Sequence, residues 1–128
     1  MSKPKVISKE RIEDYPNATK IEYDDGCYMI LWTDGTFDVY NKANESHCTW
    51  GPSRVYETLE GHRREWCIKG LKHRLDGPAV EIWEHYYSKK KEAVRYEFWL
   101  NGNRATELEK ARIIIEMSLR VNGLKNVC

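Results

Sequence analysis

The stretch that decides the fold of this chain is Trp66-Cys67-Ile68-Lys69-Gly70-Leu71-Lys72-His73-Arg74-Leu75-Asp76-Gly77-Pro78-Ala79, because related segments flank it on both sides. Upstream, Tyr40 corresponds to Trp66, and residues 47–53 correspond to residues 73–79 at an offset of 26. Downstream, residues 98–102 repeat residues 66–70 at an offset of 32. Internal periods of this length indicate one supersecondary unit that stacks on copies of itself. The sequence therefore predicts a repeat architecture.

Size and charge narrow the class of protein. The chain has 128 residues, 21 Lys and Arg, 20 Asp and Glu, and a formal net charge of +1. This length suits one domain, and a charge near zero gives no global field for a polyanion or a membrane. The four cysteines, Cys27, Cys48, Cys67 and Cys128, include no C-x-x-C pair. With no signal peptide or membrane-spanning run, we expect free thiols and a cytoplasmic location without membrane contact.

Alternating apolar runs joined by Asp-Gly turns predict two successive β-hairpins before the first repeat. Strands are expected at 21–23, 27–32 and 36–40, with turns at 24–26 and 33–35. Asp-Gly is a strong hairpin signal, because Gly adopts positive φ readily and Asp tolerates it. The repeats add strands at 54–58, 63–68, 80–83 and 93–100, and the second unit has a longer turn at 87–92.

A closing helix is predicted after the last repeat, because Thr106-Glu107-Leu108-Glu109 has the form of a capping box. Its apolar stripe consists of Leu108, Ala111, Ile115 and Leu119, widened by Ile114, Met117 and Val121. We expect a helix over 106–121 that packs this stripe on the sheet. The expected organisation is one domain over 1–128, with an irregular N-terminal arm at 1–19, β-hairpin repeats at 20–105 and the helix. The predicted fold class is mainly β (α+β), an antiparallel hairpin meander closed by one amphipathic helix.

The repeat resembles a short motif of large double-stranded DNA phages and giant viruses. The pattern Trp66-x-x-x-Gly70-x-x-His73-Arg74-x-Asp76-Gly77-Pro78-Ala79 is similar to W-Y-x-N-G-x-x-H-R-x-D-G-P-A, and the ending, Trp99-x-Asn101-Gly102 before a helix, also resembles that group. The resemblance covers residues 40 to 121 and implies MORN-like β-hairpin modules without an assigned reaction. In the first unit, Cys48-Thr49-Trp50 replaces Arg-x-Asp, so the polar triad is not kept in every unit.

His73, Arg74 and Asp76 lie beside a Gly-Pro turn and are candidates for a catalytic group. General acid–base chemistry requires the histidine and the carboxylate within mutual reach in a pocket. The upstream copy keeps its histidine and Gly-Pro but has lost the arginine and the aspartate, which favours a role in turn geometry. The histidines and cysteines also lack the close ligand pairs typical of zinc sites. We therefore expect no enzymatic activity, no metal and no cofactor.

Basic and aromatic residues interleave along the repeat strands, which is the composition of a stacking platform for single-stranded nucleic acid. The residues concerned are Arg63, Arg64, Lys69, Lys72, Arg74, Lys89, Lys90, Lys91 and Arg95, with Trp66, Trp83, Tyr86, Tyr87 and Trp99. In the alternative interpretation, the tryptophans form a core, one per strand, and the lysine run is a solvated turn. The low net charge favours the alternative.

The function that the sequence favours is non-enzymatic protein binding, because Trp, Tyr and Arg most often anchor protein interfaces. Together with the repeat resemblance, this suggests a phage accessory factor that binds or blocks a host protein in the host cytoplasm, as in counter-defence. Binding of single-stranded nucleic acid is the alternative, and self-association along an exposed edge strand is left open. The predicted binding residues are Trp50, Arg63, Arg64, Lys72, Arg74, Trp83, Tyr86 and Tyr87.

Overall fold

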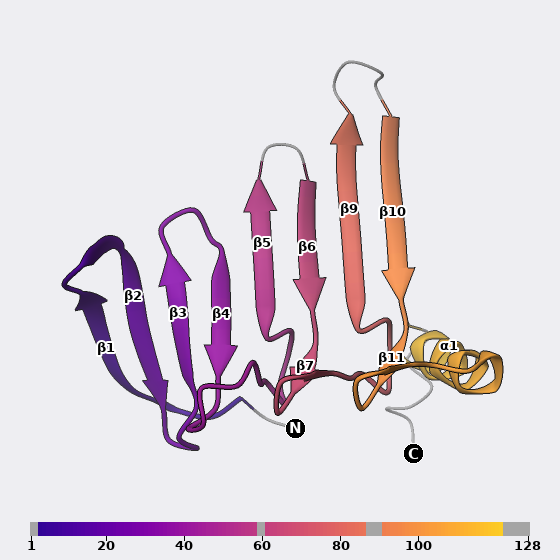
Figure 1. The fold of residues 1–128 in the computed structure, drawn as a ribbon, viewed down its shortest axis with the longest axis horizontal. Coiled ribbons are helices and arrows are strands. Elements are labelled where there is room, and N and C mark those ends of the chain that lie inside the picture. The colour runs from indigo at the N-terminus through magenta and orange to yellow at the C-terminus, as the bar shows by residue number, and fades with distance from the viewer. Residues whose placement is uncertain (1–2, 59–60, 87–90, 122–128) are drawn as a thin grey trace.

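The strands follow one another across an antiparallel sheet in the order of the sequence (Figure 1). The computed structural model describes residues 3–58, 61–86 and 91–121. The sheet strands, in spatial order, are β1 (Val6–Ile12), β2 (Tyr15–Tyr23), β3 (Tyr28–Trp32), β4 (Phe37–Tyr40), β5 (Arg54–Thr58), β6 (Gly61–Glu65), β9 (Val80–Tyr86) and β10 (Lys91–Glu97). The helix α1 (Glu107–Val121) follows them. The predicted fold class, mainly antiparallel β with a C-terminal helix, is confirmed.

Two short ribbons lie at the base of the sheet. They are β7 (Cys67–Ile68) with β8 (Leu71–Lys72), and β11 (Trp99–Leu100) with β12 (Asn103–Arg104). One residue separates each ribbon from the long strand before it, so the strands predicted at 63–68 and 93–100 are interrupted at Trp66 and Phe98. At the first interruption, the backbone amide of Trp66 donates to the carbonyl of Ala79 at 2.8 Å. This bond joins the end of β6 to the residue that precedes β9.

The irregular N-terminal arm predicted for residues 1–19 is wrong, because this region forms most of the β1–β2 hairpin. The pairing runs from Val6 with Tyr23 to Ile12 with Tyr15. Five of the seven β1 residues are exposed, since the strand lies at the sheet edge. Without a buried side, β1 lacks the apolar and polar alternation by which strands are predicted.

The two Asp-Gly turns form the predicted hairpins through a backbone geometry that uses positive φ only at the glycine. Gly26 and Gly35 have φ of 87° and 95°. The side chains of Asp25 and Asp34 instead accept hydrogen bonds from the amides two residues later, at 2.9 Å in both turns. Each connection is therefore a type I turn followed by a glycine bulge rather than a two-residue type I′ turn.

The ribbon turns do have the type I′ geometry. Lys69 and Asn101 both have φ of 49°, and the glycines that follow, Gly70 and Gly102, have φ of 81° and 82°. Positive φ at both central residues defines a type I′ turn, whose twist matches that of the flanking strands. In the upstream copy Asn44 stands where Gly70 does, and its φ is 62°. The left-handed backbone position is thus kept in all three copies.

Successive repeat units are joined by the same side-chain hydrogen bond. The Nδ1 atom of His47 accepts the backbone amide of Lys69 at 2.9 Å, and Nδ1 of His73 accepts that of Asn101 at 3.0 Å. The two acceptors are 26 residues apart and the two donors 32, which are the offsets of the sequence repeat. Each histidine therefore binds its own loop to the ribbon turn of the next unit.

Backbone hydrogen bonds beside each histidine repeat in the same way. Beside His47, the amide of Gly70 donates to the carbonyl of Ser46 at 2.8 Å, and the amide of Cys48 donates to the carbonyl of Cys67 at 3.1 Å. Beside His73, the amide of Gly102 donates to the carbonyl of Lys72 at 2.9 Å, and the amide of Arg74 donates to the carbonyl of Trp99 at 3.3 Å. We call each set of three bonds a junction. The junctions explain why the first copy, which lacks the Arg-x-Asp pair, still contains His47.

The two sides of the sheet differ in character. Residues that face each other in register lie on the same side, and Ile21, Met29 and Val39 share one side, which we call the core face. There they pack with Tyr23 and Cys48 in the main buried cluster. The opposite side, which carries Asp38, Arg54 and Glu65, we call the polar face.

The helix begins where predicted, but it packs through a different side. Its capping box is formed, because the Thr106 amide donates to Glu109 Oε1 at 2.9 Å and the Glu109 amide donates to Thr106 Oγ1 at 3.2 Å. The predicted stripe is wrong, since Leu108, Ile114 and Ile115 are exposed whereas Ile113 is 3 % exposed. Apolar residues on several sides of the helix made the spacing ambiguous.

Two polar contacts fix the orientation of α1. The Lys110 ammonium lies 5.3 Å from the centre of the Phe98 ring, and Arg120 pairs with Asp76 at 2.7 Å. Lys110, Ile113 and Arg120 lie on one side of the helix, at spacings of three and seven residues. These contacts therefore turn Ile113 inward and leave the side of Ile115 outward.

The two neighbouring isoleucines provide a matched test of this orientation. We expect Ile113→Ala to lower the free energy of unfolding by about 2–4 kcal/mol, because it removes a buried side chain. Ile115 is 57 % exposed, so Ile115→Ala should change it by less than about 1 kcal/mol. Urea denaturation followed by circular dichroism measures both. Equal effects of the two substitutions would show that the helix packs on the predicted stripe.

A second prediction concerns the junction histidines. We expect His73→Leu to lower the free energy of unfolding by about 1–3 kcal/mol, because the Asn101 amide loses its acceptor. His73→Asn should retain most of the stability, since the Asn oxygen can replace Nδ1. Urea denaturation of both variants and of the wild type is the measurement. If the Asn variant is as destabilised as the Leu variant, the contribution of His73 comes from packing.

Candidate binding surface

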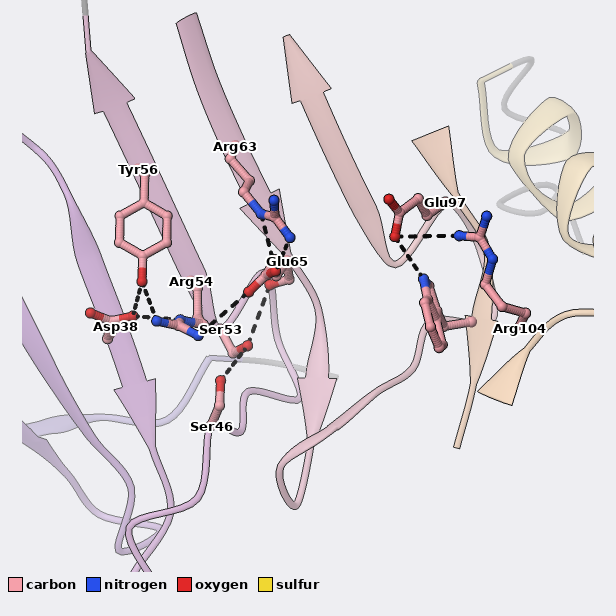
Figure 2. Close-up of polar contacts among 10 residues, drawn as sticks. Asp38, Ser46, Ser53, Arg54, Tyr56, Arg63, Glu65, Glu97 and Arg104 are labelled. Carbon is pink, nitrogen blue, oxygen red and sulfur yellow. Dashed lines mark hydrogen bonds and ion pairs between the residues drawn. The ribbon is translucent and has the colours of Figure 1, made fainter. Parts of the chain in front are cut away.

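A buried carboxylate organises the polar face of the sheet (Figure 2). Glu65 is almost completely buried, and it pairs with Arg63 at 2.6 Å and Arg54 at 3.7 Å. Arg54 also pairs with Asp38 at 3.0 Å and donates to the hydroxyl of Tyr56. A buried charge is tolerated only when it is paired and hydrogen-bonded. Arg54 and Arg63 therefore stabilise the buried carboxylate of Glu65 within the sheet.

The corresponding carboxylate of the next unit is also paired. Glu97 lies 32 residues after Glu65, accepts a hydrogen bond from the Trp99 indole at 3.0 Å and pairs with Arg104 at 3.3 Å (Figure 2). The Trp99 ring in turn lies between two cations, with Lys72 at 4.8 Å and Arg104 at 5.2 Å from its centre. In both units the carboxylate at this position is thus paired with an arginine, although the partner residues differ.

Arg74 of the central motif is held within its own loop. It pairs with Asp76 at 3.0 Å and Glu81 at 3.4 Å, and its guanidinium lies 3.9 Å from the centre of the Trp66 ring. Asp76 also binds Arg120 of the helix. The Arg-x-Asp pair therefore connects the loop to α1. The upstream copy has Cys48-Thr49-Trp50 in these positions.

Three of the basic residues that the sequence suggested for binding, Arg63, Arg74 and Arg95, are thus engaged in ion pairs within the chain. Arg54, Arg104 and Arg120 also pair with carboxylates. Carboxylates beside these guanidinium groups reduce the positive potential available to a phosphate backbone. The polar face therefore offers no continuous cationic track across the described strands.

The core face has a different surface over its last three strands. In register, His62 faces Trp83 and Trp83 faces Val94, while Arg64 faces Glu81 and Glu81 faces Tyr96. The rings of His62 and Trp83 stack at 5.2 Å with 15° between their planes. Val94 and Tyr96 are among the exposed large apolar residues. We call His62, Arg64, Trp83, Val94 and Tyr96 the aromatic face.

The predicted binding residues are distributed over several places. Arg64 and Trp83 meet on the aromatic face, whereas Arg63 lies on the polar face and Lys72 and Arg74 lie in the loops. Trp50 is half-buried against the Tyr23 ring at 5.7 Å, with the Lys3 ammonium 4.7 Å from its own ring. The side chain of Tyr86 and the whole of Tyr87 lie outside the described residues.

The predicted tryptophan ladder is not present as a continuous row. Trp66, Trp83 and Trp99 are all half-buried, and each has a different neighbour, respectively Arg74, His62 and the pair Lys72 and Arg104. They are thus neither fully buried core nor a stack of rings. Only Trp83 lies on the aromatic face.

Sequence reasoning missed His62, Val94 and Tyr96 as members of a surface. The alternation in 93–100 indicates that Val94 and Tyr96 share one side of a strand. Their position beside Trp83 depends on the β9–β10 register, which the length of the connecting turn determines. That length could not be derived from composition alone.

The polar groups of the motif are not arranged as an acid–base pair. The Nδ1 atom of His73 accepts the Asn101 amide, while Asp76 is paired with Arg74 and Arg120. Within residues 3–58, 61–86 and 91–121, no three His, Cys, Asp or Glu side chains are placed to hold a metal ion. Cys27, Cys48 and Cys67 are free thiols, and burial raises the pKa of Cys27 and Cys48.

Comparison with known proteins finds no family model, no curated protein and no solved structure that matches this chain. The helix of the described region is not long and apolar enough to cross a membrane.

The reactivity of Cys27 gives a pH-dependent prediction. Burial, followed by the charge of Asp25, raises the pKa of this thiol to about 11. Because the raised pKa disfavours the thiolate, alkylation by iodoacetamide should be slow at pH 8 and rise about tenfold per pH unit towards the pKa. Peptide-level mass spectrometry after timed labelling measures the rate.

Asp25→Asn should lower the pKa of Cys27 and increase its labelling rate a few-fold at fixed pH. The matched control is Asp34→Asn, because Asp34 accepts the same turn hydrogen bond at the opposite end of β3 from Cys27. If both variants accelerate labelling equally, loosening of the turns rather than the Asp25 charge is responsible.

Proposed function

We propose that this chain is a non-enzymatic protein-binding module that contacts its partner through the aromatic face. The observation that carries the proposal is the gathering of Trp83, Tyr96 and Arg64 on one side of three adjacent strands. These three residue types dominate the energetics of protein interfaces, where they supply large apolar contact with a polar handle. Val94 adds an exposed aliphatic contact in the same register row as Trp83.

Two features support protein binding over the binding of single-stranded nucleic acid. A nucleic-acid groove combines stacking rings with cations that track the phosphates. Here Trp83 stacks on His62, and the neighbouring Arg63 and Arg95 are paired with Glu65 and Glu84. On the aromatic face Arg64 supplies positive charge, and Glu81 lies opposite it in register. Such a surface suits a partner of mixed apolar and polar character.

The partner that we propose is a host protein. The basis is the resemblance of the repeat to those of large phages and giant viruses, whose proteins act within an infected cell. A flat sheet side without an acid–base pair suits steric occlusion or recruitment more than chemistry. The module would then cover a functional surface of its partner, in the manner of an accessory or counter-defence factor.

The test compares capture of host proteins by two immobilised variants. We expect Arg64→Ala with Tyr96→Ser to reduce capture of the specific protein at least about tenfold, because two interface anchors are lost. Tyr15→Ser is the matched control, since Tyr15 and Tyr96 are both 57 % exposed and Tyr15 lies at the far end of the sheet. Quantitative mass spectrometry of the eluates gives the ratio to the wild type.

The nucleic-acid alternative is measured on the same preparations. Fluorescence anisotropy of labelled single-stranded DNA and RNA over a series of KCl concentrations gives the affinity and its salt slope. Tight binding with a steep slope, combined with no specific protein in the wild-type eluate, would overturn the proposal. Equal loss of capture in the Tyr15→Ser control would also contradict it, because the aromatic face would then not be the contact.

A further inference from the structure

The two edges of the sheet are protected to different degrees. β1 pairs with β2 with register shifts between Val6 and Ser8 and between Arg11 and Ile12, whereas β10 pairs with β9 over seven consecutive residues without a shift. Bulges and irregular register are among the devices by which sheet edges avoid further pairing. β10 lacks this device, and its exposed residues Val94 and Tyr96 lie on the aromatic face.

The sequence repeat indicates which kind of strand fits beside β10. At the offset of 32 residues, Arg95 and Glu97 of β10 correspond to Arg63 and Glu65 of β6. β6 has a strand on each side, β5 and β9, whereas β10 has β9 on one side and is the last strand of the sheet that the described residues form. The strand that follows β6 in the sheet is β9, and its register places Ile82 opposite Arg63. An equivalent strand beside β10 would place an aliphatic residue opposite Arg95.

The helix does not take this position. α1 contacts the sheet through Lys110 with Phe98 and through Arg120 with Asp76, and both of these sheet-side residues lie outside β10. Figure 1 shows α1 beside the lower end of β10, next to the β11 ribbon. Helix α1 therefore lies at the base of the repeat, and within residues 3–58, 61–86 and 91–121 no strand pairs with the second edge of β10.

We propose that β10 binds an extended strand of the partner protein by strand addition, antiparallel to β10, as β9 binds β6. This inference rests on the proposed protein-binding function. Backbone hydrogen bonds would supply the affinity, and alternate side chains the specificity. By the β6–β9 register, the partner strand carries an aliphatic residue opposite Arg95 and an aromatic residue opposite Val94, since Trp83 is opposite His62. The aromatic residue would extend the aromatic face.

A second copy of this chain fits the β10 edge less well than a partner strand does. The unpaired edge that another copy offers beside β10 is either its β1 or its own β10. β1 carries two register shifts, the charged run Lys9, Glu10 and Arg11, and no aromatic residue. In β10 the aromatic Tyr96 follows Arg95 and not an aliphatic residue, and a β9-like strand is already paired on both sides within each copy. The repeat pattern of an aliphatic and an aromatic residue is therefore available from a different protein.

The probe is a synthetic peptide with blocked ends and the sequence of residues 79–86, added to the full-length protein. We expect the outward-facing amides among residues 94–97 to exchange with deuterium about tenfold more slowly at saturating peptide, because they gain acceptors. Exchange in β1 should not change. The same peptide with Ile82→Pro is the control, because Pro lacks an amide donor and should give no protection. NMR exchange measurements resolve the individual amides.

Three results would overturn strand addition. They are no protection of β10, equal protection by the proline peptide, and protection without peptide that increases with protein concentration, which would identify a second copy as the occupant. The proposed function is separable from this test. If Arg64→Ala with Tyr96→Ser abolishes capture of the host protein while β10 exchange stays unchanged by the peptide, the partner binds the aromatic face and the strand-addition mechanism is rejected.

Discussion

The fold depends on one hydrogen bond that occurs twice, from a turn amide to the Nδ1 atom of the histidine in the preceding unit. Neighbouring hairpins of the sheet meet along single strand pairs, and the pairing of β4 with β5 joins only Phe37 with Val55 and Asp38 with Arg54. At each junction the histidine supplies a side-chain acceptor, and two backbone hydrogen bonds lie beside it. The left-handed residues Lys69 and Asn101 present their amides to it. Loop, ribbon and strand are thereby fixed relative to one another.

This constraint explains which parts of the fold the sequence could predict. The offsets of 26 and 32, the capping box and the Asp-Gly turns are local signals, and each corresponds to a formed element. The β1 strand and the orientation of α1 depend on tertiary context. β1 has no buried side to impose alternation. The run Ile113-Ile114-Ile115 makes the helix apolar on several sides, so two distant polar contacts decide which one is buried.

The candidate surface shows the same division between local and long-range information. Composition identifies Trp83 and Arg64 as interface residue types, and the register places them together. Composition cannot show that Arg63, Arg74 and Arg95 are already paired, because their carboxylates come from other parts of the chain or lie at spacings with many structural meanings. Counting basic residues therefore overestimates the positive charge that these strands leave unpaired. Arg63, Arg74 and Arg95 form ion pairs within the chain.

The direction of the junctions also sets an order of assembly. In both cases the acceptor precedes the donor, by 22 residues from His47 to Lys69 and by 28 from His73 to Asn101. A chain that emerges from the ribosome therefore exposes each loop before its stabilising turn exists, and completes it when the following hairpin appears. The loop at residues 73–79 is secured by Arg120 of the helix, which is synthesised after both junctions. The hairpins lie in the sheet in the order in which they are synthesised. Each new hairpin therefore docks on hairpins that have already been synthesised.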